Sequence, residues 1–308
     1  MVQENCVENK NKILIICGAT ATSKSALAIE CAKILSTDII SADSLLVYKQ
    51  LNVGTAKPTI EEMQGVKHHM IDVVEPYQNF SVGDYKEKVI PIIENLHSKG
   101  KIPIICGGTG FYINSILYDL SYGNCKGDLE VREKYKKLAE QFGNEYVYNI
   151  LKEKDSASAE KLHFNDLKRV VRALEIYESG CVKSKIVDKL IPKYHYSAYM
   201  FNFEREQLYQ RINDRVDVMI NNNLVDEVKE LIKQGISLEN QAMQGIGYKE
   251  IYSYLLGEIS LEQAIDLIKL NTRHYAKRQI TYFKKMPNLN KISYGNLSEI
   301  AKRITNNL

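Results

Sequence analysis

A short stretch near the amino terminus, GATATSKS from Gly18 to Ser25, constrains the fold of this chain more than any other feature. It follows an apolar run at residues 13–17, which predicts a buried strand, and it precedes a helical pattern at residues 26–35. Strand, tight loop and helix form the context in which G-x-x-x-x-G-K-[ST] binds phosphate through backbone N–H groups and the helix dipole. Lys24 is expected to reach the terminal phosphates, and the Ser25 hydroxyl is expected to bind Mg²⁺.

One position departs from that pattern, because Ser23 occupies the place of the second glycine. Glycine adopts a left-handed or crowded backbone freely, whereas a residue with a side chain pays about 1–3 kcal/mol there. An ordinary strand-to-helix turn rich in Thr and Ser is the alternative interpretation. We favour the phosphate site because both flanking elements fit it.

The composition is that of an ordinary globular protein. The 308 residues are 44% hydrophobic and 26% charged, enough for one large or two modest domains, and the net charge of +3 does not by itself indicate a nucleic-acid partner. The polar amino terminus has no signal-peptide core, and no apolar run approaches the length of a membrane span. The cysteines show no metal-binding spacing, and they predict free thiols in the cytoplasm: Cys6, Cys17, Cys31, Cys106, Cys125 and Cys181.

Two further loops are expected beside the phosphate loop. Asp43 follows a predicted strand at residues 38–42, and GGTG, with Thr109 as its side-chain donor, follows another at residues 102–106. Because the carboxyl ends of parallel strands share one edge of a sheet, these loops would meet where α/β proteins bind ligands. Asp43 could instead cap a helix, GGTG could be only a tight turn, and Lys57 in the loop GTAKP could contact phosphate or solvent.

The alternation of strand and helix stops at about residue 120 and returns once, at residues 198–203. We therefore predict a core from residues 1–120, a helical insertion at 121–197, and completion of the core by 198–308. A strand is also predicted at residues 68–74, where the adjacent histidines His68 and His69 would be structural.

Basic residues gather on two predicted helices. Lys168, Arg169 and Arg172 lie in the insertion, and the last long helix, at residues 260–286, carries six Lys or Arg against one Asp from position 266 onward. Aromatic residues are interleaved with these charges, a combination suited to nucleic acid, although a solvated helix face is the usual alternative.

Seven ordered blocks resemble the tRNA dimethylallyltransferases, also called tRNA isopentenyltransferases, over nearly the whole chain. They are the loop Gly18–Ser25, Asp43-Ser44 with Val47-Tyr48, GTAKP at 54–58, GGTGFY at 107–112, Asn165-Asp166 with Arg169 and RALE at 172–175, QGIGYKE at 244–250, and KRQITY at 277–282. The resemblance implies a P-loop NTPase-like α/β core, with a parallel sheet flanked by helices, plus a helical insertion domain. It also implies transfer of the dimethylallyl group of dimethylallyl diphosphate to N6 of adenosine 37, with Mg²⁺, in tRNAs reading codons that begin with U.

The resemblance further implies a role for each matching position. Arg215 would hold the diphosphate together with Gly18, Ala19, Thr20, Ala21, Thr22, Ser23, Lys24 and Ser25. Ser25 would bind the metal, Thr109 would donate to the oxygen that bridges carbon and diphosphate, and Asp43 would accept the proton of the amine. The anticodon stem-loop of tRNA would contact Asp43, Ser44, Leu45, Leu46, Lys168, Arg169, Val170, Val171, Arg172, Gly245, Ile246, Gly247, Tyr248, Lys249, Glu250, Lys277, Arg278, Gln279, Ile280, Thr281, Tyr282, Phe283 and Lys284. Leu45 and Leu46 replace the commoner Met-Gln, which removes a polar contact. We expect a monomer without a membrane partner.

Three other functions fit parts of the sequence. A P-loop small-molecule kinase would use ATP and would have no use for the basic final helix. An isopentenyltransferase acting on free adenine nucleotides would not need the insertion. A non-catalytic RNA-binding protein would bind tRNA with a steep salt dependence but transfer nothing.

Replacing Ser23 with glycine tests the departure in the phosphate loop. We predict that Ser23→Gly tightens diphosphate binding or raises turnover, because glycine adopts the loop conformation without strain. Steady-state kinetics of both proteins measure this, and equal or poorer values for the variant would contradict it.

Overall fold

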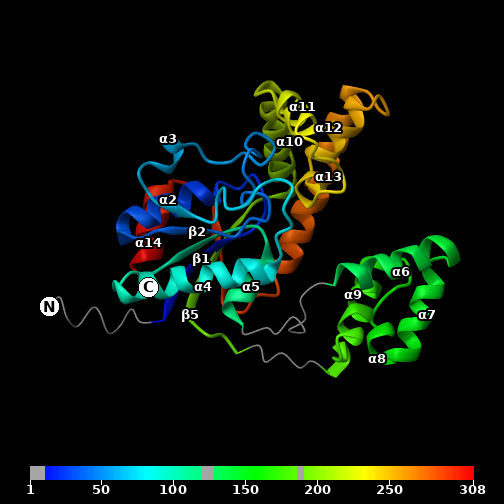
Figure 1. The fold of residues 1–308 in the computed structure, drawn as a ribbon. Coiled ribbons are helices and arrows are strands. Elements are labelled where there is room, and N and C mark those ends of the chain that lie inside the picture. The colour runs from blue at the N-terminus through cyan, green and yellow to red at the C-terminus, as the bar shows by residue number, and fades with distance from the viewer. Residues whose placement is uncertain (1–10, 119–127, 186–190) are drawn as a thin grey trace. The chain divides into compact units, whose positions relative to one another are not determined.

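A parallel sheet with the strand order β3-β2-β4-β1-β5-β6 forms the centre of the described structure (Figure 1). Its strands are β1 (Lys12–Cys17), β2 (Ile39–Ser41), β3 (His68–His69), β4 (Ile104–Gly107), β5 (His195–Asn202) and β6 (Leu289–Ser293). The register pairs Leu14 with Ile104 on one side of β1 and with Ser197 on the other. The loops that follow β1, β2 and β4 therefore lie at one edge of the sheet, where parallel α/β folds bind ligands.

Helices cover both faces of the sheet. Helices α2 (Lys24–Leu35) and α14 (Leu297–Thr305) pack together on one face, where their apolar side chains form a core with Leu14, Ile104 and Phe201. Helices α4 (Val82–Ser98) and α5 (Gly110–Leu117) cover the opposite face (Figure 1). Burial on both faces explains why the central strands are continuous apolar runs.

The rest of the core lies beyond the carboxyl edge of the sheet. It contains α3 (Ile60–Met63), α10 (Arg205–Asn221), α11 (Leu224–Lys233), the 3₁₀ turn η2 (Gln241–Gln244), α12 (Tyr248–Leu255) and α13 (Leu261–Phe283). A capping box closes the start of α13, because Ser260 and Gln263 each accept a bond from the other's backbone N–H.

The structure, a computed structural model, describes residues 11–118, 128–185 and 191–308, and these divide into two compact units. The core unit consists of Met1–Leu117 and Pro192–Leu308, and the second unit is Tyr118–Ile191. Within the second unit lie α6 (Leu129–Phe142), α7 (Asn144–Lys154), α8 (Ser156–Ala159), α9 (Leu167–Glu178) and the 3₁₀ turn η1 (Lys183–Lys185). Their apolar side chains form a core separate from that of the sheet.

The predicted fold class is confirmed, and two element predictions are wrong. The strand predicted at 68–74 is reduced to β3, because Met70 and Asp72 adopt left-handed conformations that end it. The alternation of strand and helix returns twice rather than once, since β6 and α14 complete the core after β5. Strand β6 was not predicted because its sequence contains no apolar run. It lies at the edge of the sheet, and of its residues Ile292 alone is buried.

Candidate active site

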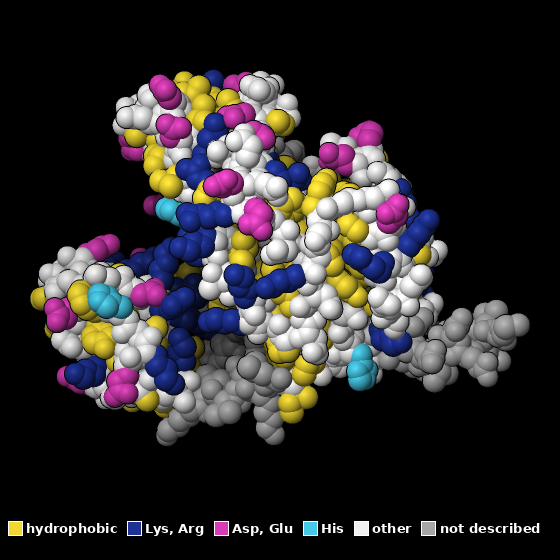
Figure 2. Space-filling view, turned by 180° about the vertical axis from the view of Figure 1, so that it is seen from behind, with side chains coloured by type: hydrophobic (Ala, Val, Ile, Leu, Met, Phe, Trp, Pro, Cys, Tyr) yellow, Lys and Arg dark blue, Asp and Glu magenta, His cyan; other side chains and the backbone are white. Residues whose placement is uncertain are grey.

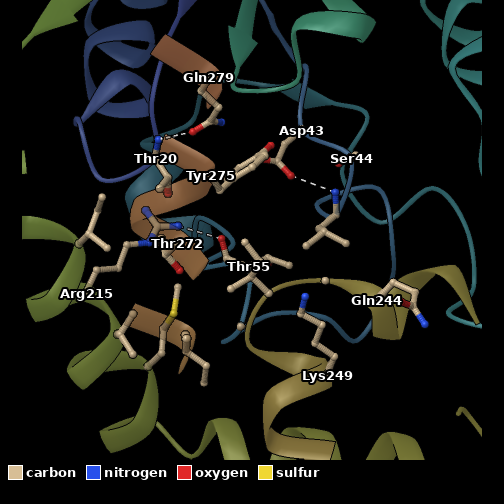
Figure 3. Close-up of a pocket in the computed structure, with 18 of the residues that line it drawn as sticks. Thr20, Asp43, Ser44, Thr55, Arg215, Gln244, Lys249, Thr272, Tyr275 and Gln279 are labelled. Carbon is tan, nitrogen blue, oxygen red and sulfur yellow. Dashed lines mark hydrogen bonds between the residues drawn. The ribbon is translucent and has the colours of Figure 1, made fainter. Parts of the chain in front are cut away.

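The phosphate loop follows β1 and requires glycine at its first position. Gly18 has φ +127°, and a Cβ there would lie 2.7 Å from Met200 Cγ. Ala21 and Ser23 adopt left-handed conformations with φ 59° and φ 61°. The backbone N–H of Thr20 donates to Gln279 Oε1 at 3.0 Å, so α13 contacts the loop directly (Figure 3).

A cavity of about 400 Å³ opens beside this loop. Its lining includes Lys24 from the start of α2 and Arg215 from α10, both half-buried. Lys24 Nζ donates to the Ala19 carbonyl at 3.1 Å, and Arg215 Nη2 donates to the Thr55 carbonyl at 3.0 Å. Burial lowers the pKa of Lys24 and that of Arg215, since desolvation disfavours their charged forms. Two desolvated cations held this way favour the entry of an anion.

Asp43 is the one acidic residue among the described residues that line this cavity. Its Oδ1 accepts the backbone N–H of Leu45 at 2.9 Å, which forms a turn rather than the helix cap that we considered. The Tyr275 hydroxyl lies beside the carboxylate (Figure 3), and burial followed by the Asp43 charge raises the pKa of Tyr275 to about 12. Tyr275 therefore remains a protonated donor near neutral pH, and sequence analysis did not single it out.

Thr109 lies directly behind this carboxylate turn. Its hydroxyl accepts the backbone N–H of Ser44 at 3.1 Å and is also hydrogen-bonded to the Tyr275 side chain. As a hydroxyl it can still donate its own proton. The adjacent glycines allow close packing, since a Cβ on Gly107 would lie 2.1 Å from the Ala42 carbonyl oxygen. The GGTG turn thus presses the loop after β4 against the loop after β2.

The rest of the cavity lining mixes polar side chains, among them Gln241, Gln244, Lys249 and Arg278, with a group of aliphatic ones. The aliphatic side chains are Leu45, Ile212, Val216, Met219 and Ile268. A cavity that combines cations near the phosphate loop with a group of aliphatic side chains suits a ligand that joins an anionic group to a hydrocarbon.

Lys57 is not available to a ligand, contrary to both possibilities left open by the sequence. Its side chain is 8% exposed, donates to the Tyr48 carbonyl at 2.9 Å and forms an ion pair with Asp72. The histidines are structural, as predicted: His68 Nδ1 bonds to the Val66 carbonyl, and His69 Nε2 bonds to Asp38.

Glu227 on α11 organises the loop that carries Thr55, and nothing in the sequence pattern indicated this. Its carboxylate accepts the backbone N–H groups of Asn52, Val53 and Gly54 at 2.9, 2.7 and 3.1 Å, and the Tyr248 hydroxyl at 2.6 Å. Since the Thr55 carbonyl accepts from Arg215, Glu227 indirectly fixes a cation of the cavity.

Three of the predicted RNA-contacting stretches lie in the core unit. Asp43, Ser44 and Leu45 line the cavity, as do Gly245, Ile246 and Lys249. The side chains of Tyr248 and Glu250 are buried, and Glu250 accepts the Gly247 N–H at 2.8 Å. These two residues shape the turn.

The last predicted stretch is the carboxyl-terminal part of α13, where buried and exposed side chains alternate by helix face. Gln279 and Phe283 are buried, and Gln279 Nε2 donates to the Gly108 carbonyl at 3.0 Å. Ile280 and Tyr282 are half-buried, and the Tyr282 hydroxyl accepts from Asn114 at 2.6 Å. The exposed face carries Lys277, Arg278, Thr281, Lys284 and Lys285. Figure 2 shows groups of Lys and Arg side chains on the visible surface.

In the second unit, Lys168 and Arg169 are exposed on α9, whereas Val170 and Val171 are buried in its core. Arg172 forms an ion pair with the buried Glu175 at 2.6 Å, so its charge is partly neutralised within the unit. The predicted site residues that the structure brings to this one cavity include Thr20 and Lys24 of the loop, Asp43, Arg215, Gly245, Ile246 and Lys249. Thr109 is not among its lining residues, and residues 168–172 belong to the second unit.

The described part of the chain contains neither a disulfide nor a cluster of metal-ligating side chains. Cys17, Cys31, Cys106 and Cys181 are free thiols, and Cys6 and Cys125 lie outside the described residues. No group of three or more His, Cys, Asp or Glu within 11–118, 128–185 and 191–308 is arranged to hold a metal. In the same ranges, no helix is both long enough and apolar enough to cross a bilayer.

The fold and cavity define a P-loop type α/β protein in which cations and aliphatic side chains line one cavity beside the loop. Residues 46–286 match the family described as IPP transferase. The chain is 50% identical over 285 residues to the tRNA dimethylallyltransferase of Caldanaerobacter subterraneus subsp. tengcongensis, covering 89% of each. The chain belongs to this family of tRNA dimethylallyltransferases (IPP transferases).

Solved structures agree with this assignment. The tRNA isopentenylpyrophosphate transferase of Bacillus halodurans superposes with a TM-score of 0.73 at 36% identity, covering 96% of each chain. A eukaryotic dimethylallyltransferase acting on tRNA superposes with a TM-score of 0.80 at 30% identity, covering 96% of this chain and 77% of that one.

The role of Glu227 can be measured as stability. Glu227→Gln replaces a carboxylate oxygen by an amide NH₂ that faces backbone donors, so we expect the free energy of unfolding to fall by about 1–3 kcal/mol. Urea denaturation measures it. Glu230→Gln on the same helix, whose partner is the exposed Lys233, serves as the control and should change stability by less than about 0.5 kcal/mol. Equal effects of the two substitutions would contradict the assigned role.

Proposed function

We propose that this enzyme transfers the dimethylallyl group of dimethylallyl diphosphate to N6 of adenosine 37 in tRNAs that read codons beginning with U. The observation that carries the proposal is the cavity in a member of this family, which brings together half-buried cations, one carboxylate and a group of aliphatic side chains. The cations suit the diphosphate, and the aliphatic side chains suit the prenyl group.

The residues support a direct displacement. As the carbon–oxygen bond to diphosphate breaks, Lys24 and Arg215 offset the charge on the departing group. As the carbon–nitrogen bond forms, the adenine amine loses a proton, and Asp43 is the one carboxylate among the described lining residues to accept it. Thr109 would donate its hydroxyl proton to the bridging oxygen. The target base must leave its stack to enter the cavity.

Mg²⁺ fits this site as a partner of the diphosphate. Ser25 lines a small cavity together with Lys24 and Asp43, and its hydroxyl supplies an oxygen ligand of the kind that Mg²⁺ prefers. Since no cluster of three metal-ligating side chains exists in the described residues, the diphosphate and water would complete the coordination. When bound, the ion would stabilise charge on the leaving group.

The RNA would be held by cations that line the cavity and by exposed cations on α13. Lys249 and Arg278 line the cavity, and Lys277 and Lys284 extend the basic face of α13. We propose that the second unit is a tRNA-contacting insertion domain that contributes Lys168 and Arg169. A single copy of the chain supplies every proposed site residue, so we propose a monomer. Buried free thiols support a cytoplasmic location.

Asp43→Asn tests the proton acceptor more sharply than Asp43→Ala. Asparagine keeps an oxygen for the Leu45 N–H but is not a base, so we expect the transfer rate to fall by about 100-fold or more while tRNA affinity changes less than about threefold. Asp43→Ala should also abolish transfer. Single-turnover transfer and tRNA-binding titrations measure the two effects, and a fully active asparagine variant would remove Asp43 from the mechanism.

The substrate assignment is tested with labelled dimethylallyl diphosphate and labelled ATP. We expect the prenyl label to appear in unmodified tRNA that reads U-starting codons, and no transfer of the ATP phosphate to a small acceptor. Label in free adenosine monophosphate at a comparable rate would favour an enzyme acting on free nucleotides. tRNA binding without any transfer would indicate the non-catalytic alternative.

A further inference from the structure

Arg211, on α10 one turn before Arg215, is bonded to the phosphate loop at two points. Its Nε donates to the Ala21 carbonyl at 2.8 Å, and its Nη2 donates to Ser23 Oγ at 2.7 Å. Ala21 and Ser23 are the two loop residues with side chains in left-handed conformations. The guanidinium therefore contacts the strained part of the loop.

The guanidinium is itself held in place by aromatic rings. It lies 5.1 Å from the centre of the Phe203 ring and 5.0 Å from that of Tyr294, and the two ring centres are 5.3 Å apart. Phe203 follows β5 and Tyr294 follows β6, so the arginine is anchored to the end of the sheet. Such contacts orient a planar cation whose donors form a rigid fork.

The hydroxyl that Arg211 contacts exists because this chain has serine where the phosphate-loop pattern has glycine. A residue with a side chain is strained in the left-handed region, whereas glycine is not. A bond from Nη2 to Ser23 and a bond from Nε to Ala21 recover part of that cost only in this conformation. Both bonds would be lost if the loop relaxed to negative φ.

We propose that Arg211 is a positioning residue that holds the phosphate loop in its anion-binding conformation, replacing in this chain the conformational freedom of glycine at position 23. The loop conformation determines where its N–H groups point, and so determines diphosphate affinity. The proposal rests on the proposed function in one respect, the use of this loop for diphosphate.

The main rival is that Arg211 binds diphosphate directly, because it lines a second cavity with Ser23, Lys24, Ser25 and Arg215. The two roles differ in what Ser23→Gly does. If Arg211 only positions the loop, glycine makes it dispensable. If it binds diphosphate, glycine does not restore the lost contact.

The test measures affinity for inorganic pyrophosphate by calorimetry in the full chain, with KM values for dimethylallyl diphosphate and for tRNA. We expect Arg211→Ala to weaken pyrophosphate binding and raise the KM for dimethylallyl diphosphate about five- to tenfold, with the KM for tRNA unchanged. In Arg211→Ala, Ser23→Gly should return both values to within about threefold of the parent. The gain from Ser23→Gly should be larger there than in the parent chain.

Arg205→Ala is the matched control, because Arg205 is exposed on the same helix with its guanidinium over Tyr209, and among the described residues no hydrogen bond joins it to the loop. It should leave pyrophosphate affinity unchanged. Arg211→Lys keeps the positive charge but loses the planar guanidinium with its several donors. Its affinity for pyrophosphate should therefore lie between that of the parent chain and that of Arg211→Ala. Thermal melting of each variant shows whether it is folded.

Failure of Ser23→Gly to rescue Arg211→Ala, or an equal gain from glycine in both backgrounds, would overturn the proposal. An Arg211→Lys variant with parental affinity would do the same, because charge alone would then suffice. These results are separable from the proposed function: if the parent chain transfers no dimethylallyl group, the pyrophosphate titrations still decide whether Arg211 positions the loop.

Discussion

The placement of two half-buried cations, Lys24 and Arg215, beside one cavity is the constraint on which the rest of the site depends. Burial lowers the pKa of both groups, so the fold must hold two charges in a place that disfavours them. Each is fixed through a backbone carbonyl, Lys24 through Ala19 and Arg215 through Thr55. The core therefore holds two cations in fixed positions, and the carboxylate of Asp43 lines the same cavity.

A second layer of contacts secures these carbonyls. Glu227 gathers three successive N–H groups next to Thr55, Gln279 joins the phosphate loop to the GGTG turn, and Arg211 holds Ala21 and Ser23. All three come from helices beyond the carboxyl edge of the sheet. The sheet thus positions the loops, and these helices fix their local conformation.

How far the sequence could predict the site differs from residue to residue. The loop, Asp43 and the GGTG turn could be predicted because each directly follows an apolar strand, and parallel strands end at one edge. Lys57 could not be assigned, because its carbonyl and carboxylate partners are fixed by loops that have no periodic pattern. Glu227 and Tyr275 looked like ordinary helical residues, since their importance depends on which elements their helices pack against.

The sequence by itself determined the α/β class, the phosphate loop, the acidic residue beside it and the basic terminal helix, because these depend on local order and periodicity. Only the tertiary structure decided which α13 residues are exposed and which side chains build the apolar half of the cavity. It also decided how a serine is accommodated where glycine is expected. Those outcomes depend on contacts between residues nearly 200 positions apart, such as Arg211 with Ser23, and no local pattern encodes such contacts.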